Sequence, residues 1–270
     1  MKGFPVLMTM TTDISFTSTS PKSKADILVL PAYEGVELGG LAESVTKENN
    51  GYIKTYLDDQ KKFTGKVGQV FTIVAPQETL YRHYMIVGLG KKDDATVLKY
   101  EEAGGKVAAA LKAIDVKSIV VEGRDIDHEI GVHIASGISL ARYDFLKYKT
   151  GKKSDEKKPL SVKVLTDQVK KAKALSADLE AMISGVKLAR DLINEPPNML
   201  YPESYAKIIK DELKPLGVKV TILDEKKLLK MKMGGVMAVG QASVNQPRVV
   251  VMEWNGAKKK AQKPLGFVGK

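Results

Sequence analysis

Two histidines, His128 and His133, are the first residues of this sequence whose type and spacing suggest chemistry. They stand in HEIGVH, which is close to the H-E-x-x-H pattern, where histidines four positions apart bind one zinc ion and the glutamate acts as base. Here the histidines are five positions apart, so on a helix of 3.6 residues per turn the two rings point roughly 140° apart. They cannot share a metal on one helical face, and we interpret both as structural residues.

Two glycine-containing stretches look like parts of phosphate-binding loops but lack essential positions. Gly151–Ser154, GKKS, has Leu146 where the first glycine of a P-loop would stand and Lys153 in place of its Ser or Thr. Gly88–Lys91, GLGK, lacks the third glycine of a dinucleotide-binding loop and the acidic residue that would bind the ribose. We predict turns at both places, so a nucleotide-binding function has no supporting loop. No serine stands in the G-x-S-x-G context of a nucleophile elbow either.

The elements that would position a site in the first part of the chain alternate between apolar runs and amphipathic stretches. Apolar runs predict strands, and Lys2–Ser20 suits an edge strand. Gly104 and Gly105, inside a predicted helix, indicate close packing on a neighbouring element. This alternation predicts an α/β sheet covered by helices. The predicted strands are Ala25–Leu30 (closed by Pro31), Val67–Val74, Tyr84–Leu89, Lys117–Glu122 and Ser161–Thr166, and the predicted helices are Leu41–Asn50, Tyr100–Ala113, Asp127–Tyr143 and Asp167–Leu192.

The second part of the chain begins after a helix that must end at Pro196–Pro197, because proline lacks the N–H that a helix needs. Asn194, Asn198 and Pro202 are typical of an ordered connector, since Asn side chains bond nearby backbone groups. From spacing alone this is an ordinary boundary between a helix and a turn. Beyond it we predict helices at Pro202–Leu213 and Asp224–Lys230 and strands at Val218–Leu223, Val249–Trp254 and Leu265–Val268, and before it Thr150–Lys158 is a polar loop.

Composition restricts the class of protein. A chain of 270 residues with 43% hydrophobic residues is globular. The absence of cysteine excludes disulfides, Cys-ligated zinc and thiol catalysis and fits the cytoplasm. No apolar run approaches the roughly 20 residues that cross a membrane. We interpret the first residues as an N-terminal strand or a frayed end rather than a signal peptide. The net charge of +11 admits binding to DNA, but the lysines are dispersed and aromatic residues are only 6%, so a solvated surface is favoured.

A resemblance adds to this interpretation. The stretch Leu188–Pro202, LARDLINEPPNMLYP, resembles the N-E-P-x-N-x-x-x-P connector of the M17 leucine aminopeptidases (cytosol aminopeptidases). MGGVMAVGQAS, PRVVVMEWNG and VGK then follow in the order of that family. Upstream, Ala141–Thr150, ARYDFLKYKT, is similar to the helix end of the family, with Leu146 where an Asp is usual. The matching connector residues are Asn194, Glu195, Pro196, Asn198 and Pro202.

The resemblance implies an architecture and an activity. We expect a macro-domain-like N-terminal domain (residues 1–165), a mixed sheet flanked by helices, then a connecting helix (166–193) and the start of an α/β metallopeptidase catalytic domain (194–270). The implied reaction is hydrolytic release of N-terminal amino acids, often leucine, from peptides by a homohexamer. The family uses two divalent cations per site, zinc or manganese, which activate a shared water and polarise the scissile carbonyl.

Within this chain the resemblance assigns only Lys270, in VGK, as a metal ligand. A lysine can bind a metal only as the neutral amine, which requires burial beside the cation. In the family the other ligands and the catalytic groups follow this lysine. We therefore expect no catalytic residue within this chain, and neither metal binding nor activity from it in isolation. The alternative function is a non-catalytic module of the same ancestry that binds nucleic acid or supports oligomer assembly.

Overall fold

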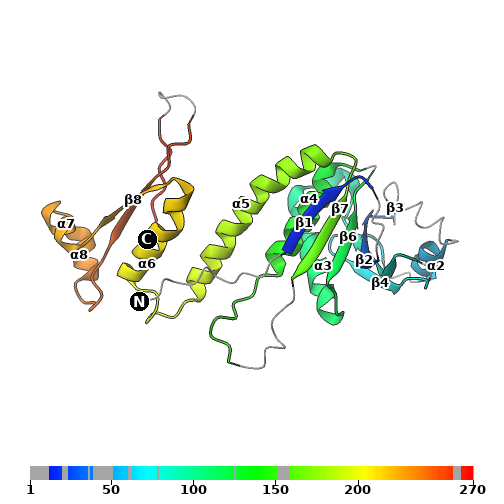
Figure 1. Cartoon of the computed structure of the whole chain (residues 1–270), viewed down its shortest axis with the longest axis horizontal. Helices are drawn as coiled ribbons and strands as arrows, with labels where there is room; N and C mark the ends of the chain where they lie inside the picture. The colour runs from blue at the N-terminus through cyan, green and yellow to red at the C-terminus, as the bar shows by residue number, and fades with distance from the viewer. Residues whose placement is uncertain are drawn as a thin grey trace. The chain divides into compact units, whose positions relative to one another are not determined.

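The structure is a computed structural model that describes residues 12–19, 24–35, 37–38, 51–59, 63–77, 79–124, 126–150, 159–257 and 263–269. The chain forms two compact units, one within Leu7–Asp191 and one within Leu192–Lys270. Each unit has its own sheet (Figure 1). Among the described residues, no helix is long and apolar enough to cross a membrane.

The sheet of the first unit has parallel strands along most of its width. In spatial order it contains β1 (Thr12–Thr17), β7 (Leu160–Leu165), β6 (Ser118–Glu122), β2 (Ala25–Tyr33), β5 (Tyr81–Gly88) and β4 (Val70–Val74). β4 is antiparallel to β5, and the short β3 (Glu37–Leu38) is antiparallel to the end of β2. The predicted mixed α/β fold is confirmed, and the strand expected within Lys2–Ser20 is an edge strand, β1.

Helices cover both faces of this sheet. α3 (Val97–Ala110) and α4 (His128–Ala141) enclose one apolar core with alternate strand residues such as Ile27 and Val29. α2 (Tyr52–Asp59) packs through Ile53 and Leu57 on the other face, against Leu28 and Leu30. This division follows from the two-residue period of a strand. The long helix α5 spans Val169–Asn194. α2 was not predicted from the sequence, and the helix predicted at Leu41–Asn50 lies outside the described residues.

α3 and α4 cross where each lacks a side chain. A Cβ atom added to Gly104 would collide with the carbonyl oxygen of Ile134, and one added to Gly137 would collide with that of Glu101. The predicted close packing is therefore found at Gly104. At Gly105 an added Cβ would make only an ordinary contact, 3.9 Å from the nearest side-chain atom. The crossing is tight because two glycines, 33 positions apart, face each other's backbone.

The prediction that Pro31 closes its strand was wrong, since β2 continues to Tyr33. Along a strand the N–H and C=O groups point alternately to the two neighbours. The carbonyl of Ala32 accepts from Leu89 on the β5 side, so the nitrogen of Pro31 faces the β6 side. Pairing with β6 ends at Val29. The missing N–H of the proline therefore lies on the side where pairing with β6 has ended, and β2 continues through its bonds to β5.

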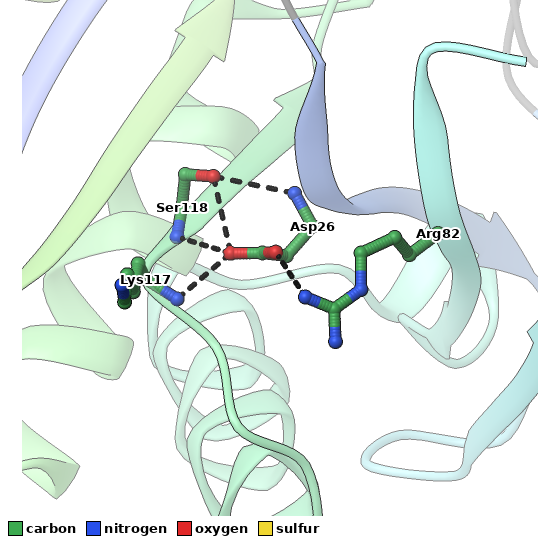
Figure 2. A network of polar contacts seen from close by, with 4 residues as sticks. All are labelled: Asp26, Arg82, Lys117 and Ser118. Atoms are coloured by element: carbon green, nitrogen blue, oxygen red, sulfur yellow. Dashed lines mark hydrogen bonds and ion pairs between the residues drawn. The ribbon is translucent and has the colours of Figure 1, made fainter.

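Asp26 connects the beginnings of three parallel strands (Figure 2). Its carboxylate accepts hydrogen bonds from the N–H groups of Lys117 and Ser118, at 2.8 and 2.9 Å, and from the Ser118 hydroxyl at 3.3 Å. Arg82, on β5, donates to the other carboxylate oxygen at 2.9 Å. Burial alone would raise the pKa of Asp26, but these backbone donors, the Arg82 charge and the hydroxyl together lower it below its ordinary value.

The second unit contains α6 (Pro202–Leu213), the antiparallel pair β8 (Lys219–Leu223) and β9 (Val249–Glu253), α7 (Glu225–Lys230) and α8 (Gly234–Gly240). As predicted, Asp224 caps α7, since its carboxylate accepts from the N–H of Lys227 at 3.0 Å. α8 was not predicted. The strand expected at Leu265–Val268 was wrong: these residues have no strand structure, and Val268 is fully exposed. An apolar run forms a strand only beside a partner, and no described strand pairs with it.

Candidate functional site

The connector singled out in the sequence is an ordered turn between two helices. α5 ends at Asn194, and after Glu195 the carbonyl of Pro196 accepts from the N–H groups of Met199 and Leu200, both at 2.9 Å. Pro202 occupies the first turn of α6, where a missing N–H costs no helical bond. Asn198 is exposed on this turn.

The beginning of α6 is fixed by one hydroxyl. The Ser204 hydroxyl accepts from the N–H of Tyr201 at 3.0 Å and donates to the carbonyl of Met199 at 2.8 Å. It therefore links the turn after the two prolines to the first turn of the helix. This satisfies an N–H group that has no partner within the helix.

The structure brings together the first residues of two stretches that resembled the aminopeptidase family, Ala141–Thr150 and Leu188–Pro202. Tyr143, just after α4, donates its hydroxyl to the carboxylate of Asp191 on α5 at 2.8 Å. Arg190 donates to the carbonyl of Leu140 at 2.9 Å, and its guanidinium lies 5.5 Å from the centre of the Tyr143 ring. Two adjacent residues of α5 therefore hold its last turns against the end of α4, three residues before the connector begins.

The same junction concentrates positive charge around one buried carboxylate. The ammonium group of Lys187 donates to the hydroxyl of buried Ser139 at 3.2 Å. Burial lowers the pKa of Lys187, and the charges of Arg142 and Arg190 lower it further, while Asp191 acts in the opposite direction. Burial also lowers the pKa of Arg142. Asp191 is only 4% exposed, so its charge is held inside the junction and acts on this cluster rather than on solvent.

Sequence reasoning did not single out Tyr143, Lys187 or Asp191. A signal was present for Asp191, because it lies between Leu188 and Leu192 on the inner side of a predicted helix, where a carboxylate is rarely buried without a partner. The identity of that partner depends on the tertiary fold, since Tyr143 is 48 positions away. The junction is a structural anchor for α5: the Tyr143 hydroxyl is bonded to Asp191, and the Ser139 hydroxyl is buried.

The two histidines and the glycines of GLGK contact neighbouring residues of the first unit. His133 is buried between α4 and α3, with its Nδ1 atom 2.9 Å from a carboxylate oxygen of Glu101. His128 lies instead beside Asp127, 2.9 Å away. Around Gly88–Lys91, the N–H groups of Gly88 and Gly90 donate to Gln69 and Gly65, so they are not directed at a phosphate. GKKS, residues 151–154, lies outside the described residues.

The predicted metal ligand, Lys270, also lies outside the described residues. Within the part of the chain that the structure describes, no group of three or more His, Cys, Asp or Glu side chains is arranged to hold a metal ion. The described residues therefore do not by themselves form the metal centre that the resemblance implies.

Comparison with protein families agrees with the motifs. Residues 29–152 match the N-terminal domain of the cytosol aminopeptidase family, and residues 187–270 match the catalytic domain of the same family. A probable cytosol aminopeptidase from Wolbachia pipientis wMel is 35% identical over 265 residues, which cover 94% of this chain and 51% of the relative. One from Agrobacterium fabrum is 36% identical over 264 residues, covering 96% and 52%. This chain thus spans about half the length of these relatives.

Solved structures share the fold. A mutant of tomato leucine aminopeptidase superimposes with a TM-score of 0.73 at 23% identity, over 90% of this chain and 51% of that one. The bottromycin maturation enzyme BotP in complex with Mn gives 0.66 at 21% identity, over 86% and 45%. The family is one of metallopeptidases, which implies divalent metal ions. Because two domain models of one family match in order along this sequence, the chain belongs to the M17 cytosol aminopeptidase family.

Proposed function

We propose that the protein carrying this sequence is a metal-dependent, leucyl-type aminopeptidase that releases N-terminal amino acids from peptides. The observation that carries this proposal is the match of both family domains, in order, to residues 29–152 and 187–270. The N-terminal domain is joined here to the beginning of the catalytic domain. This arrangement favours aminopeptidase activity, as in the family, over a non-catalytic function of either domain alone. The names of the relatives agree with this activity.

The proposed division of labour follows the connector. Residues 1–165 form the N-terminal domain, 166–193 the connecting helix and 194–270 the start of the catalytic domain. Asn194, Glu195, Pro196, Asn198 and Pro202 shape the turn into that domain, and no catalytic residue is assigned within this chain. Lys270 would be a metal ligand, and it could serve only as a neutral amine. The 270 residues alone would then be inactive, because one lysine does not complete a two-metal centre.

The finer properties are also proposals. Two manganese or zinc ions would be bound at each complete site, the substrates would be peptides with a free α-amine, and the protein would work in the cytoplasm as a homohexamer. Light scattering of the purified native protein tests the hexamer, because six copies of even this 29.5 kDa chain would exceed 170 kDa, about six times the mass of a single copy.

The first experiment is the intact mass of the native protein, followed by an activity assay on that same protein. After dialysis against a chelator we expect no release of leucine from a leucyl peptide, and addition of Mn²⁺ or Zn²⁺ should restore it. Lys270→Arg should abolish the restored activity, because arginine cannot become a neutral donor in a protein. Leucine release that survives both the chelator and Lys270→Arg would contradict the proposal. A native mass near 29.5 kDa with metal-dependent activity intact would instead contradict the inactivity proposed for the 270 residues alone.

Nucleic-acid binding is not favoured, since the relatives named above are aminopeptidases and only the net charge of +11 points towards phosphate. A gel-shift series tests it cheaply. Retardation of duplex DNA that falls steeply between low and physiological salt would revive this alternative, because phosphate contacts release counterions.

A further inference from the structure

A groove runs beside the open edge of the first sheet. It is lined by the consecutive residues Ile14, Ser15 and Phe16 of β1, and on the other side by residues of α5. Consecutive strand residues point to opposite faces of a sheet, so a groove that touches all three follows the edge of the strand rather than one face. Among the described strands, β1 has a neighbour, β7, on one side only.

The backbone groups at this edge can be assigned a direction. The carbonyl of Thr17 accepts from the N–H of Thr166, so the peptide groups of Thr17 face β7. Because the direction alternates along a strand, those of Ser15 also face β7, whereas the N–H and C=O of Ile14 and Phe16 point away from the sheet. Hydrogen-bonding groups of β1 are therefore directed at the groove.

One face of α5 forms the opposite wall. Lys173, Ser176, Ala177 and Glu180 line the groove, and their spacing of three, four and seven positions places them on a single helical stripe. The buried hydroxyl of Ser176 donates to the Glu180 carboxylate at 2.9 Å, so Glu180 is bonded along its own helix. The volume of about 260 Å³ is just below the range of roughly 300–1,000 Å³ for small-molecule pockets.

We propose that this groove binds an extended peptide segment, which adds to the sheet as a strand beside β1 and carries an acidic side chain that meets Lys173. Main-chain hydrogen bonds to an exposed strand edge are an established way of binding peptides. Lys173 lines the groove and has no hydrogen bond or ion pair to another described residue, and the net charge of +11 also favours an acidic partner. Ile14, Phe16 and Ala177 supply apolar contact.

The edge is also poorly protected against such an addition. Natural proteins shield open edges with proline, lysine or a bulge. β1, TDISFT, has neither proline nor lysine, and its register with β7 is continuous over all six residues, so it has no bulge. Its one charged side chain belongs to Asp13. Neither the composition of β1 nor its register with β7 therefore blocks the addition of a further strand.

The test uses the full chain and a fluorescein-labelled octapeptide in which valines alternate with two glutamates and two threonines. An acetylated N-terminus removes the free amine, so binding is independent of aminopeptidase activity. Fluorescence anisotropy should show saturable binding, and the matched peptide with lysines in place of the glutamates should bind more weakly. Lys173→Glu should reverse this preference, because the groove then offers a negative charge at that position.

A matched pair of variants isolates the backbone contact. Ile14→Ala and Ile14→Pro both remove the side chain, but only the proline removes the outward N–H, and neither affects a bond to β7. We expect Ile14→Pro to bind the acidic peptide roughly two- to tenfold more weakly than Ile14→Ala, the effect of one net hydrogen bond. Retained circular dichroism shows that both variants fold. Equal binding by these variants, equal binding of the two peptides, or no binding at millimolar peptide would overturn the proposal.

Discussion

Replacing Asp26 by Asn should destabilise the first unit by about 2–3 kcal/mol, and the contacts in Figure 2 explain this magnitude. The carboxylate accepts from two backbone N–H groups on Lys117 and Ser118. Hydrogen bonds to a charged group contribute about 1.5–3 kcal/mol, against about 1 kcal/mol for neutral ones, so each bond weakens by about 1 kcal/mol in the variant. The ion pair to Arg82 adds at most about 1 kcal/mol, because that arginine is 59% exposed.

The effect should depend on pH with a definite sign. Because the folded state lowers the pKa of Asp26, the carboxylate stabilises the protein fully above the unfolded pKa of about 4, and this contribution is lost as the pH falls through the lower folded pKa. Hydrogen exchange of peptides from β2 and β6, followed by mass spectrometry, should therefore show a large difference between wild type and variant at pH 7 and a smaller one at pH 3.

Asp13→Asn is the matched control for this prediction. Asp13 is an exposed carboxylate on the edge strand of the same sheet, so its replacement should change stability by less than about 0.5 kcal/mol. The reasoning fails if both variants lose the same stability, or if the difference for Asp26→Asn stays constant down to pH 3. Peptides from β8, in the other unit, serve as an internal reference.

Two further predictions concern helix contacts. Gly104→Ala should lower the free energy of unfolding by about 2–4 kcal/mol, because the added methyl overpacks the crossing with α4. Gly105→Ala should be neutral or stabilise by up to about 1 kcal/mol. Urea unfolding followed by circular dichroism distinguishes the two variants, and equal effects would refute the assigned crossing. Tyr143→Phe should lower the free energy of unfolding by about 1–3 kcal/mol, because it leaves the buried carboxylate of Asp191 without the tyrosine hydroxyl as donor. We expect faster hydrogen exchange in the last turns of α5, and unchanged exchange there would argue against the anchor.

The fold was largely predictable because most of its strands are apolar runs whose burial does not depend on exact pairing. Ala25–Tyr33 is such a run in the middle of the sheet. Its end was not predictable, because the cost of Pro31 depends on which neighbour its missing N–H would face. The failure at Leu265–Val268 has the related reason that an apolar run needs a paired neighbour. The periodicity of apolar residues indicates which residues are buried, but it does not indicate which strand lies beside them.

Less of the candidate site was predictable. The prolines at positions 196, 197 and 202 determine where helices end and begin, because proline acts on its own backbone, and the predicted bounds of α6 agree with the structure. The anchor formed by Tyr143 and Asp191 depends on two helices meeting, so its residues looked ordinary one at a time. In the sequence, Tyr143 and Asp191 shared only one feature: each lies in a stretch that resembles the family. That feature does not predict that the two side chains touch.

The crossing of α3 and α4 was predictable only in part from the local sequence. Adjacent glycines in a helix indicate that a neighbour approaches closely, but they do not say which glycine faces it. The period of 3.6 residues narrows the choice, since Ala103, Val107 and Ala108 define the buried side and Gly104 belongs to it. The partner, Gly137, occupies the apolar stripe of a second helix that contains Ile134 and Ile138. Gly104 and Gly137 lie on the buried stripes of the two helices and allow the backbones of α3 and α4 to approach closely. A methyl group on either glycine would prevent this approach, whatever residue stands at the other position. The pair is therefore a single unit of packing, and a methyl group at either glycine should destabilise the first unit through the same collision with the opposite backbone.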